Sequence, residues 1–331
     1  MDYYTEMTKK KQDVVTDKFQ PKKKRNLIML DFIKNKLSDG GLELFRECST
    51  FNQFITTENK EHKKLVGSNA CKNRFCPICS WRKARKDAFM LATIMTAIQT
   101  EKKYEYIMMT LTTPNVKAID LKLEIDRFNV SFKKMFMRKR VQSAIKGYVR
   151  KLEVTYNKER DDYNPHFHII LAVNKSYFTD KRYYISQKEW LEMWRDVTGL
   201  DGFSENGTDE ITQLNIKKVK GIKEGNAISE VAKYSAKDYE MTTSKIVFDT
   251  FYSALKGRQL ITFNGIFKDY RKKYKSGELD KYKEADLNEY VYKMLARWNS
   301  EYRKYEQVYE LMTDEEKEEF NGQKENEIEV E

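Results

Sequence analysis

The sequence predicts an α+β fold built around a mainly antiparallel sheet, and three observations support this prediction. Between residues 86 and 262, segments of strand-like alternation are interleaved with amphipathic helical segments. Two strand segments are separated only by the polar residues 157–164, which predicts a β-hairpin. Apolar residues make up 40% of the 331 residues, enough for a sizeable core.

The individual elements follow from local patterns. The first helix is amphipathic and is expected to end before Gly40 and Gly41, the second changes from basic to apolar, and Pro114 stops the first strand. In chain order, the predicted helices span residues 26–39, 81–99, 121–140, 188–197 and 228–238. The predicted strands span residues 104–113, 148–156, 166–173 and 211–219.

Composition divides the chain into five regions. A basic arm (1–25) precedes a cysteine-bearing region expected to bind zinc (26–85). The α+β domain (86–262) follows, and then a region of helical pattern rich in tyrosine and lysine (263–312). The acidic tail (313–331) is expected to be disordered.

The charge distribution points to a polyanionic partner. The chain carries a formal net charge of +11, but residues 314–331 alone carry −7, which leaves +18 on the rest. A body this basic is typical of proteins that bind nucleic acid. No apolar run approaches the ~20 residues of a membrane span, and the basic N-terminus lacks the apolar core of a secretory signal, so we expect a cytoplasmic protein without a membrane partner.

A candidate metal site lies on the predicted hairpin. His166 and His168 are two residues apart in a strand, so their imidazoles share a face while Phe167 points to the other. On the partner strand, Glu153 stands between apolar residues and is a candidate third ligand. Two imidazoles and a carboxylate suit Mn²⁺ or Mg²⁺ with positions left open for a phosphate oxygen. The alternative is a histidine pair packed near a sheet edge without a metal.

A tyrosine lies in the last predicted helix. Glu230, Tyr234 and Lys237 are spaced four and three residues apart and are expected to share one helical face. A metal-polarised phosphate is a substrate for a tyrosine nucleophile, a lysine would stabilise developing charge, and a glutamate could activate water. The alternative is that Tyr234 is an ordinary helix tyrosine. Tyr239 follows five residues later, which rotates it off that face, so we expect it to be accessory or structural.

The four cysteines supply the ligand number of a closed zinc site. Cys71, Cys76 and Cys79 form a tight cluster, and Cys48 is the fourth thiol, with His62 as an alternative ligand. Disulfides are the other alternative, disfavoured for a cytoplasmic protein. A basic segment that could hold DNA phosphates follows directly: Arg82, Lys83, Arg85 and Lys86.

Taken together, three separated motifs resemble the HUH endonuclease superfamily. They are Thr110-Leu111-Thr112, His166-Phe167-His168, and Tyr234 with Lys237. The chain is most similar to plasmid rolling-circle replication initiators (Rep) of Gram-positive bacteria. Within these it resembles the single-tyrosine class, which has a glutamate four residues before the tyrosine and a cysteine cluster.

The resemblance implies an HUH-type domain with a central antiparallel sheet flanked by helices, and it assigns roles to residues. His166 and His168 would bind the catalytic divalent ion with Glu153 as third ligand. Tyr234 would attack the origin strand, Glu230 would activate water for the terminating cleavage, and Lys237 would support the tyrosine. The cysteine cluster would hold structural zinc.

The implied function is replication initiation. The protein would nick one strand of the plasmid double-strand origin, form a 5′-phosphotyrosine link, leave a free 3′-OH primer, and later cleave and rejoin the strand. Implied partners are origin DNA, as duplex and as single-stranded hairpin, together with host helicase and polymerase, and a homo-oligomer is possible. The alternatives are a relaxase or single-tyrosine transposase, or a non-enzymatic zinc-containing DNA-binding regulator.

Overall fold

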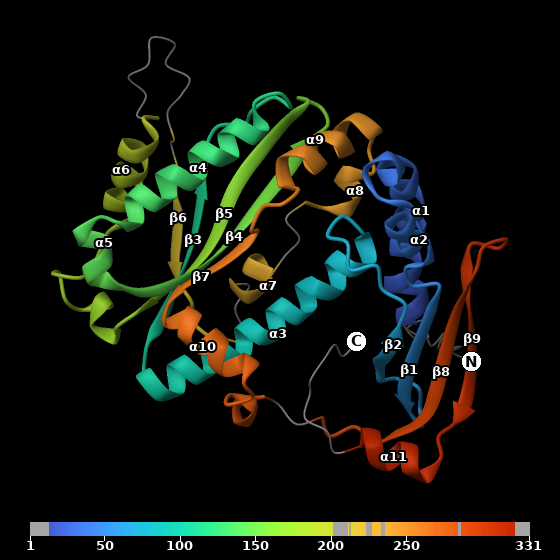
Figure 1. Ribbon diagram of the computed structural model, residues 1–331. Helices are drawn as coiled ribbons and strands as arrows, with labels where there is room; N and C mark the ends of the chain where they lie inside the picture. Colours follow the sequence, from blue (N-terminus) through green and yellow to red (C-terminus); the bar gives the residue numbers. More distant parts are fainter. Residues whose placement is uncertain are drawn as a thin grey trace, which may run out of the picture. The chain divides into compact units, whose positions relative to one another are not determined.

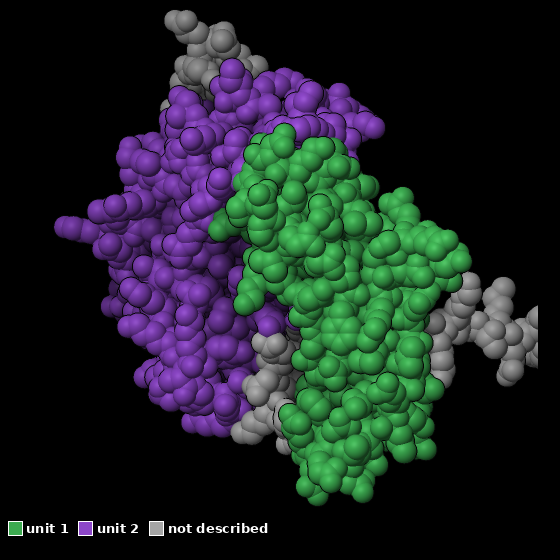
Figure 2. Space-filling view, turned by 45° about the vertical axis from the view of Figure 1, so that its right-hand side comes forward, with its two compact units in different colours: residues 1–80, 285–331 green, residues 81–284 purple. Residues whose placement is uncertain are grey.

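The computed structural model describes residues 13–200, 211, 213–222, 227–232, 236–283 and 286–321. The chain divides into two compact units, one made of residues 1–80 with 285–331 and the other of residues 81–284 (Figure 2). Within the described ranges, no helix combines the length and the apolar character needed to cross a bilayer.

The second unit is built on a five-stranded antiparallel sheet in the order β6-β3-β5-β4-β7 (Figure 1). Its strands are β3 (Glu105–Thr112), β4 (Ile145–Asn157), β5 (Asp162–Val173), β6 (Asn215–Lys218) and β7 (Ile261–Gly265). Its α-helices are α3 (Pro77–Lys102, which starts in the first unit), α4 (Leu121–Phe136), α5 (Lys139–Ala144), α6 (Gln187–Thr198), α7 (Ala227–Ala232), α8 (Asp238–Met241), α9 (Lys245–Leu255) and α10 (Ile266–Lys275). Two 3₁₀ turns complete it, η3 (Lys175–Phe178) and η4 (Asp280–Tyr282). This arrangement confirms the predicted α+β class and the predicted hairpin, which is β4–β5.

Strand alternation gives this sheet two covered faces. On one face, Ile170 and Ala172 of β5 join a buried cluster with residues of α3, α7 and α10. On the other face, Phe167 stacks on Phe128 of α4 with ring centroids 4.2 Å apart. Helices thus cover both faces, α3 and α10 on one and α4 with α6 on the other (Figure 1).

The first unit contains a four-stranded antiparallel sheet in the order β2-β1-β8-β9. Its strands are β1 (Phe51–Thr57), β2 (Lys63–Ser68), β8 (Tyr290–Asn299) and β9 (Lys304–Leu311). Its helices are the π-helical turn η1 (Val15–Phe19), α1 (Gln20–Ile33), the 3₁₀ turn η2 (Lys34–Lys36), α2 (Asp39–Glu47) and α11 (Asp314–Phe320). Phe19 packs edge-on against Phe54 of β1, so the N-terminal helical segment is part of this core.

The prediction of a basic arm up to residue 25 and a helix over 26–39 was wrong in its boundaries. Helical structure begins at Val15, and Lys23 is fully buried. The Lys23 ammonium donates hydrogen bonds to the backbone carbonyls of Arg46 and Cys48 at 2.7 and 2.8 Å. The charge of this lysine is therefore not exposed to solvent, and its ammonium acts as a hydrogen-bond donor inside the protein. The two glycines lie inside α2 instead of ending a helix, because the Ser38 hydroxyl accepts from the Gly41 amide and caps α2.

The prediction of a helical region over 263–312 holds only for α10. Residues 290–311 form the hairpin β8–β9, and β8 pairs with β1. The buried residues of β8 are separated by even numbers of positions, as expected for one face of a strand: Tyr290, Met294 and Ala296. Pairing with β1 provides hydrogen-bond partners for the backbone amides and carbonyls of β8. Part of the acidic tail is also ordered, since Thr313 and Glu316 form a capping box at the start of α11.

The backbone of β7 lies so close to Gly147 of β4 that this position has no room for a side chain. A Cβ there would lie 2.5 Å from the Asn264 carbonyl oxygen and 2.8 Å from the Ile266 amide nitrogen, both backbone atoms. We expect Gly147→Ala to lower the free energy of unfolding by about 1–3 kcal/mol in urea titrations. The matched control is Gly40→Ala in α2, where a Cβ meets open space and stability should be unchanged or rise by up to about 1 kcal/mol. A Gly147→Ala protein as stable as the wild type would contradict the β4–β7 packing.

Candidate metal centre and tyrosine segment

The β4–β5 hairpin brings Glu153, His166 and His168 together. Glu153 is paired directly with His166 across the two strands, so their side chains and that of His168 lie on one face. Glu153 Oε2 lies 3.0 Å from His168 Nε2 and 3.4 Å from His166 Nε2. All three side chains are largely buried at the site. The structure therefore assembles the three residues predicted from the sequence.

The second nitrogen of each imidazole is held by a neighbouring group. His166 Nδ1 lies 3.2 Å from the Asn164 carbonyl oxygen, which can only accept, so with the proton on Nδ1 the Nε2 atom would be the nitrogen available to a metal ion. His168 Nδ1 lies 3.4 Å from the Thr110 hydroxyl, on the strand directly paired with it. Such contacts orient the imidazoles of metal sites.

These donors fit a divalent ion. Adjacent ligands of an octahedral ion with bonds of about 2.1 Å are about 3.0 Å apart, close to the two Nε2–Oε2 distances. All donor atoms lie within 4.8 Å of one another. Burial alone would raise the pKa of Glu153, but hydrogen bonds from His166 and His168 hold it well below its usual range, so the carboxylate is ionised.

Helix α7 carries a fourth group to this centre. Ala227 and Val231 are buried in the core beneath the sheet, and this packing fixes the helix. Glu230 lies between them in sequence, with Oε2 3.6 Å from His168 Nε2. The sequence placed Glu230 on the tyrosine segment but gave no sign of its proximity to His168.

The predicted helix over 228–238 is interrupted. The α7 helix ends at Ala232, and Lys237 has extended backbone angles and precedes α8. Glu230 and Lys237 therefore do not share one continuous helical face as predicted. Tyr234, the predicted nucleophile, lies outside the described residues.

Lys237 lies in an acidic environment beside the centre. Burial lowers its pKa, but a hydrogen bond with Tyr239 and the charges of Glu240 and Glu153 raise it above its usual value. Its Nζ is 3.6 Å from Glu240 Oε1. Tyr239 itself is 55% exposed.

Sequence reasoning missed Glu240. Its carboxylate is buried and accepts a 2.9 Å hydrogen bond from the Tyr156 amide of β4, so it ties α8 to the hairpin. Burial raises the pKa of Glu240, partly offset by that amide and by Lys237. The spacing of three residues between Lys237 and Glu240 is the one sequence feature that could have indicated their ion pair.

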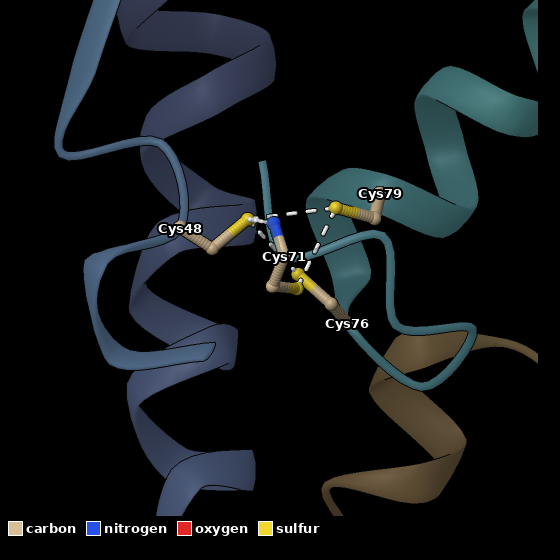
Figure 3. A group of neighbouring side chains, drawn as sticks. All are labelled: Cys48, Cys71, Cys76 and Cys79. Atoms are coloured by element: carbon tan, nitrogen blue, oxygen red, sulfur yellow. Dashed lines mark hydrogen bonds between the residues drawn. The ribbon is translucent and has the colours of Figure 1, made fainter. Parts of the chain in front are cut away.

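The four cysteines form a second cluster, in which the sulfur atoms point toward one another (Figure 3). The Sγ–Sγ distance is 3.5 Å for Cys48–Cys79 and 3.6 Å for Cys71–Cys79 and Cys48–Cys76. Tetrahedral zinc with Zn–S bonds of about 2.3 Å separates its sulfurs by about 3.8 Å, whereas a disulfide needs about 2.05 Å. All four thiols are free, and the geometry fits zinc.

Two buried polar side chains of α1, Asn26 and Lys23, lie beside this cluster. The Asn26 amide donates to Cys76 Sγ at 3.5 Å, and the Lys23 ammonium is bound to the Cys48 carbonyl. Four thiolates with Zn²⁺ carry a net charge of −2, which a nearby ammonium partly offsets. His62, the alternative ligand, is exposed in the turn before β2 and is not a member of the cluster.

The basic segment that begins α3 is only partly available to DNA. Lys83 is exposed, and its Nζ is 2.6 Å from Asp87 Oδ1. The side chains of Arg82, Arg85 and Lys86 are half-buried. Their contacts with phosphates remain a prediction.

Comparison with known proteins identifies the family. The family model described as replication protein matches residues 62–309, about three quarters of the chain. The chain belongs to this family of replication proteins. This confirms the resemblance to Rep initiators of Gram-positive bacteria.

Individual relatives agree. Protein rep of Staphylococcus aureus is 52% identical over 229 residues, 69% of this chain and 96% of that protein. Protein rep of Streptococcus pneumoniae serotype 2 (strain D39 / NCTC 7466) is 30% identical over 312 residues, 88% of this chain and 95% of that protein. Protein rep of Bacillus amyloliquefaciens is 30% identical over 293 residues, 80% and 84% of the two chains. No solved structure matches the chain significantly.

The cysteine cluster predicts a ligand assignment that zinc analysis can check. Cys48→Ser should lose most bound zinc and lower the free energy of unfolding by a few kcal/mol, because metal binding free energy contributes to folding. His62→Ala is the matched control and should retain zinc, measured by atomic absorption on purified protein. Retention of zinc by Cys48→Ser with loss in His62→Ala would reverse the assignment.

Proposed function

We propose that this chain initiates rolling-circle replication of a plasmid by nicking one strand of the double-strand origin. The observation that supports this most strongly is the convergence of Glu153, His166 and His168 with Glu230 on one sheet face. A replication protein without nicking activity has no need of such a cluster. The basic body of the chain supplies the affinity for origin DNA, whose nick region is taken as single strand.

The proposed reaction is a transesterification by Tyr234. The tyrosine oxygen attacks the phosphorus and releases its proton, the bond from phosphorus to the 3′ oxygen breaks, and that oxygen takes up a proton. The products are a 5′-phosphotyrosine link and a free 3′-OH that a polymerase can extend. A divalent ion held by Glu153, His166 and His168 would polarise the phosphate.

Two further side chains near the centre, Lys237 and Glu230, would stabilise negative charge and accept a proton. The Lys237 ammonium, kept protonated by its acidic neighbours, offsets negative charge on the tyrosine oxygen and the phosphate. In the terminating cleavage Glu230 takes a proton from a water molecule, whose oxygen attacks phosphorus in place of a tyrosine; the bond from phosphorus to the 3′ oxygen breaks, and that oxygen takes up a proton. The two glutamates thereby have separate roles, Glu153 as ligand and Glu230 as base.

Tyr234→Phe should abolish the covalent protein–DNA adduct. The assay incubates protein with a labelled single-stranded oligonucleotide carrying the nick region and Mn²⁺, and detects adduct by denaturing electrophoresis. Tyr239→Phe is the matched control and should form adduct at a rate within a fewfold of the wild type. An adduct that persists in Tyr234→Phe and disappears in Tyr239→Phe would transfer the nucleophile to Tyr239. Tight origin binding with no adduct in the wild type would support the regulator alternative.

Glu230→Gln should separate the two cleavages. Adduct formation by Tyr234 should be largely retained, whereas hydrolytic cleavage should slow by about 10²–10⁴-fold, the usual contribution of a general base. Single-turnover time courses of both products measure this ratio. Equal loss of both steps would show that Glu230 acts on the metal centre as a whole and not as the base for water.

A further inference from the structure

A cavity of about 550 Å³ opens on the sheet face opposite the metal centre. It lies between α4, α5 and the first half of β4, all within the second unit. Tyr148 and Arg150 of β4 line it, and strand alternation places them on the other face from Glu153. This volume is within the range of small-ligand sites.

The lining is aromatic and cationic. Phe132, Phe136 and Tyr148 supply rings, with the Tyr148 centroid 5.2 Å from that of Phe132 and 4.9 Å from that of Phe136. Lys133, Lys146 and Arg150 supply positive charge. Among the described residues, no carboxylate lines the cavity.

Arg150 is the most informative of these residues. Its guanidinium packs against two rings, 4.6 Å from the Phe132 centroid and 4.2 Å from the Phe167 centroid. Nη1 is buried and has no hydrogen-bond partner among the described residues. Burial lowers the pKa of Arg150 to about 10, and the charge of Tyr148 acts in the opposite direction. A buried N–H group without an acceptor is costly, and an anion in the cavity would supply that acceptor to Nη1.

We propose that this cavity, the Arg150 pocket, binds one nucleotide of single-stranded DNA, with its phosphate at the cations and its base against the rings. Arginine and lysine recognise phosphate oxygens, and bases stack on aromatic side chains without sequence preference. The pocket is a DNA contact on the far side of the sheet from the nicking centre. It goes beyond the proposed function, because a strand can bind there whether or not it is cleaved.

The test measures binding in a Tyr234→Phe background, so that cleavage does not interfere. A fluorescein-labelled oligothymidine is titrated with full-length protein, and anisotropy gives the dissociation constant. Arg150→Met, which keeps the packing volume, should weaken binding about tenfold or more, as expected for a lost charged hydrogen bond. Phe136→Leu should weaken it severalfold through lost stacking.

Neighbouring lysines of α4 give a matched pair that avoids the core. Lys133 and Lys134 are both exposed, but only Lys133 lines the pocket. Lys133→Gln should weaken binding and reduce the slope of log affinity against log salt by about 0.7, the value for one phosphate contact to a single strand. Lys134→Gln should leave both quantities unchanged. Equal effects of the two substitutions would overturn the proposal, since they would indicate only a diffuse basic surface.

Two further readouts identify the occupant. An oligothymidine carrying 5-iododeoxyuridine should photocrosslink to the peptide that contains Phe136 or Tyr148, and Arg150→Met should abolish this crosslink. Crosslinks confined to peptides of the metal face would overturn the proposal. Thymidine monophosphate should compete far more weakly than the oligonucleotide; a free nucleotide that binds the pocket while the strand does not would also overturn it. Neither result depends on adduct formation by Tyr234.

Discussion

The antiparallel register between β4 and β5 is the constraint on which the candidate metal centre depends. Glu153 faces His166 across the hairpin, and His168 follows two residues later on the same face. A slip of one residue would turn Glu153 to the opposite face, where it would meet the aromatic layer around Phe167. Register is fixed because both faces are buried: Phe167 stacks on Phe128 on one side, and Ile170 enters the core on the other.

The other groups of the candidate site are held by contacts with the β4–β5 hairpin. Thr110 of β3 and the Asn164 carbonyl orient the two imidazoles, and the Tyr156 amide holds Glu240 of α8. The α7 helix adds Glu230 by packing Val231 into the sheet core. The strands therefore position the three residues proposed as metal ligands, while the short helices α7 and α8 bring Glu230 and Glu240 beside them. This division is expected where ligand positions must be held closely and substrate must enter and leave.

Local spacing explains why much of this was predictable. The histidine pair, the hairpin turn and the cysteine cluster each depend on residues close in sequence, where strand and metal-ligand periodicities are informative. The turn length predicted that Glu153 would lie near the histidines on the same face, and the structure supplies the exact pairing with His166. The environments of Lys23 and Arg150 were not predictable, because the sequence does not distinguish a basic side chain in solvent from one inside the protein. The tyrosine- and lysine-rich pattern of residues 290–311 predicts a helix, but β8 pairs with β1 and β9 pairs with β8, and this long-range pairing decides for strand.

We infer that the sheet prepares one divalent ion site from Glu153, His166 and His168. The most direct measurement is an anomalous difference map from crystals of the protein grown with Mn²⁺. We expect a peak within about 2.0–2.3 Å of Glu153 Oε2 and of both histidine Nε2 atoms. Saturating Mn²⁺ with no peak at these atoms, or a peak bound elsewhere, would contradict it.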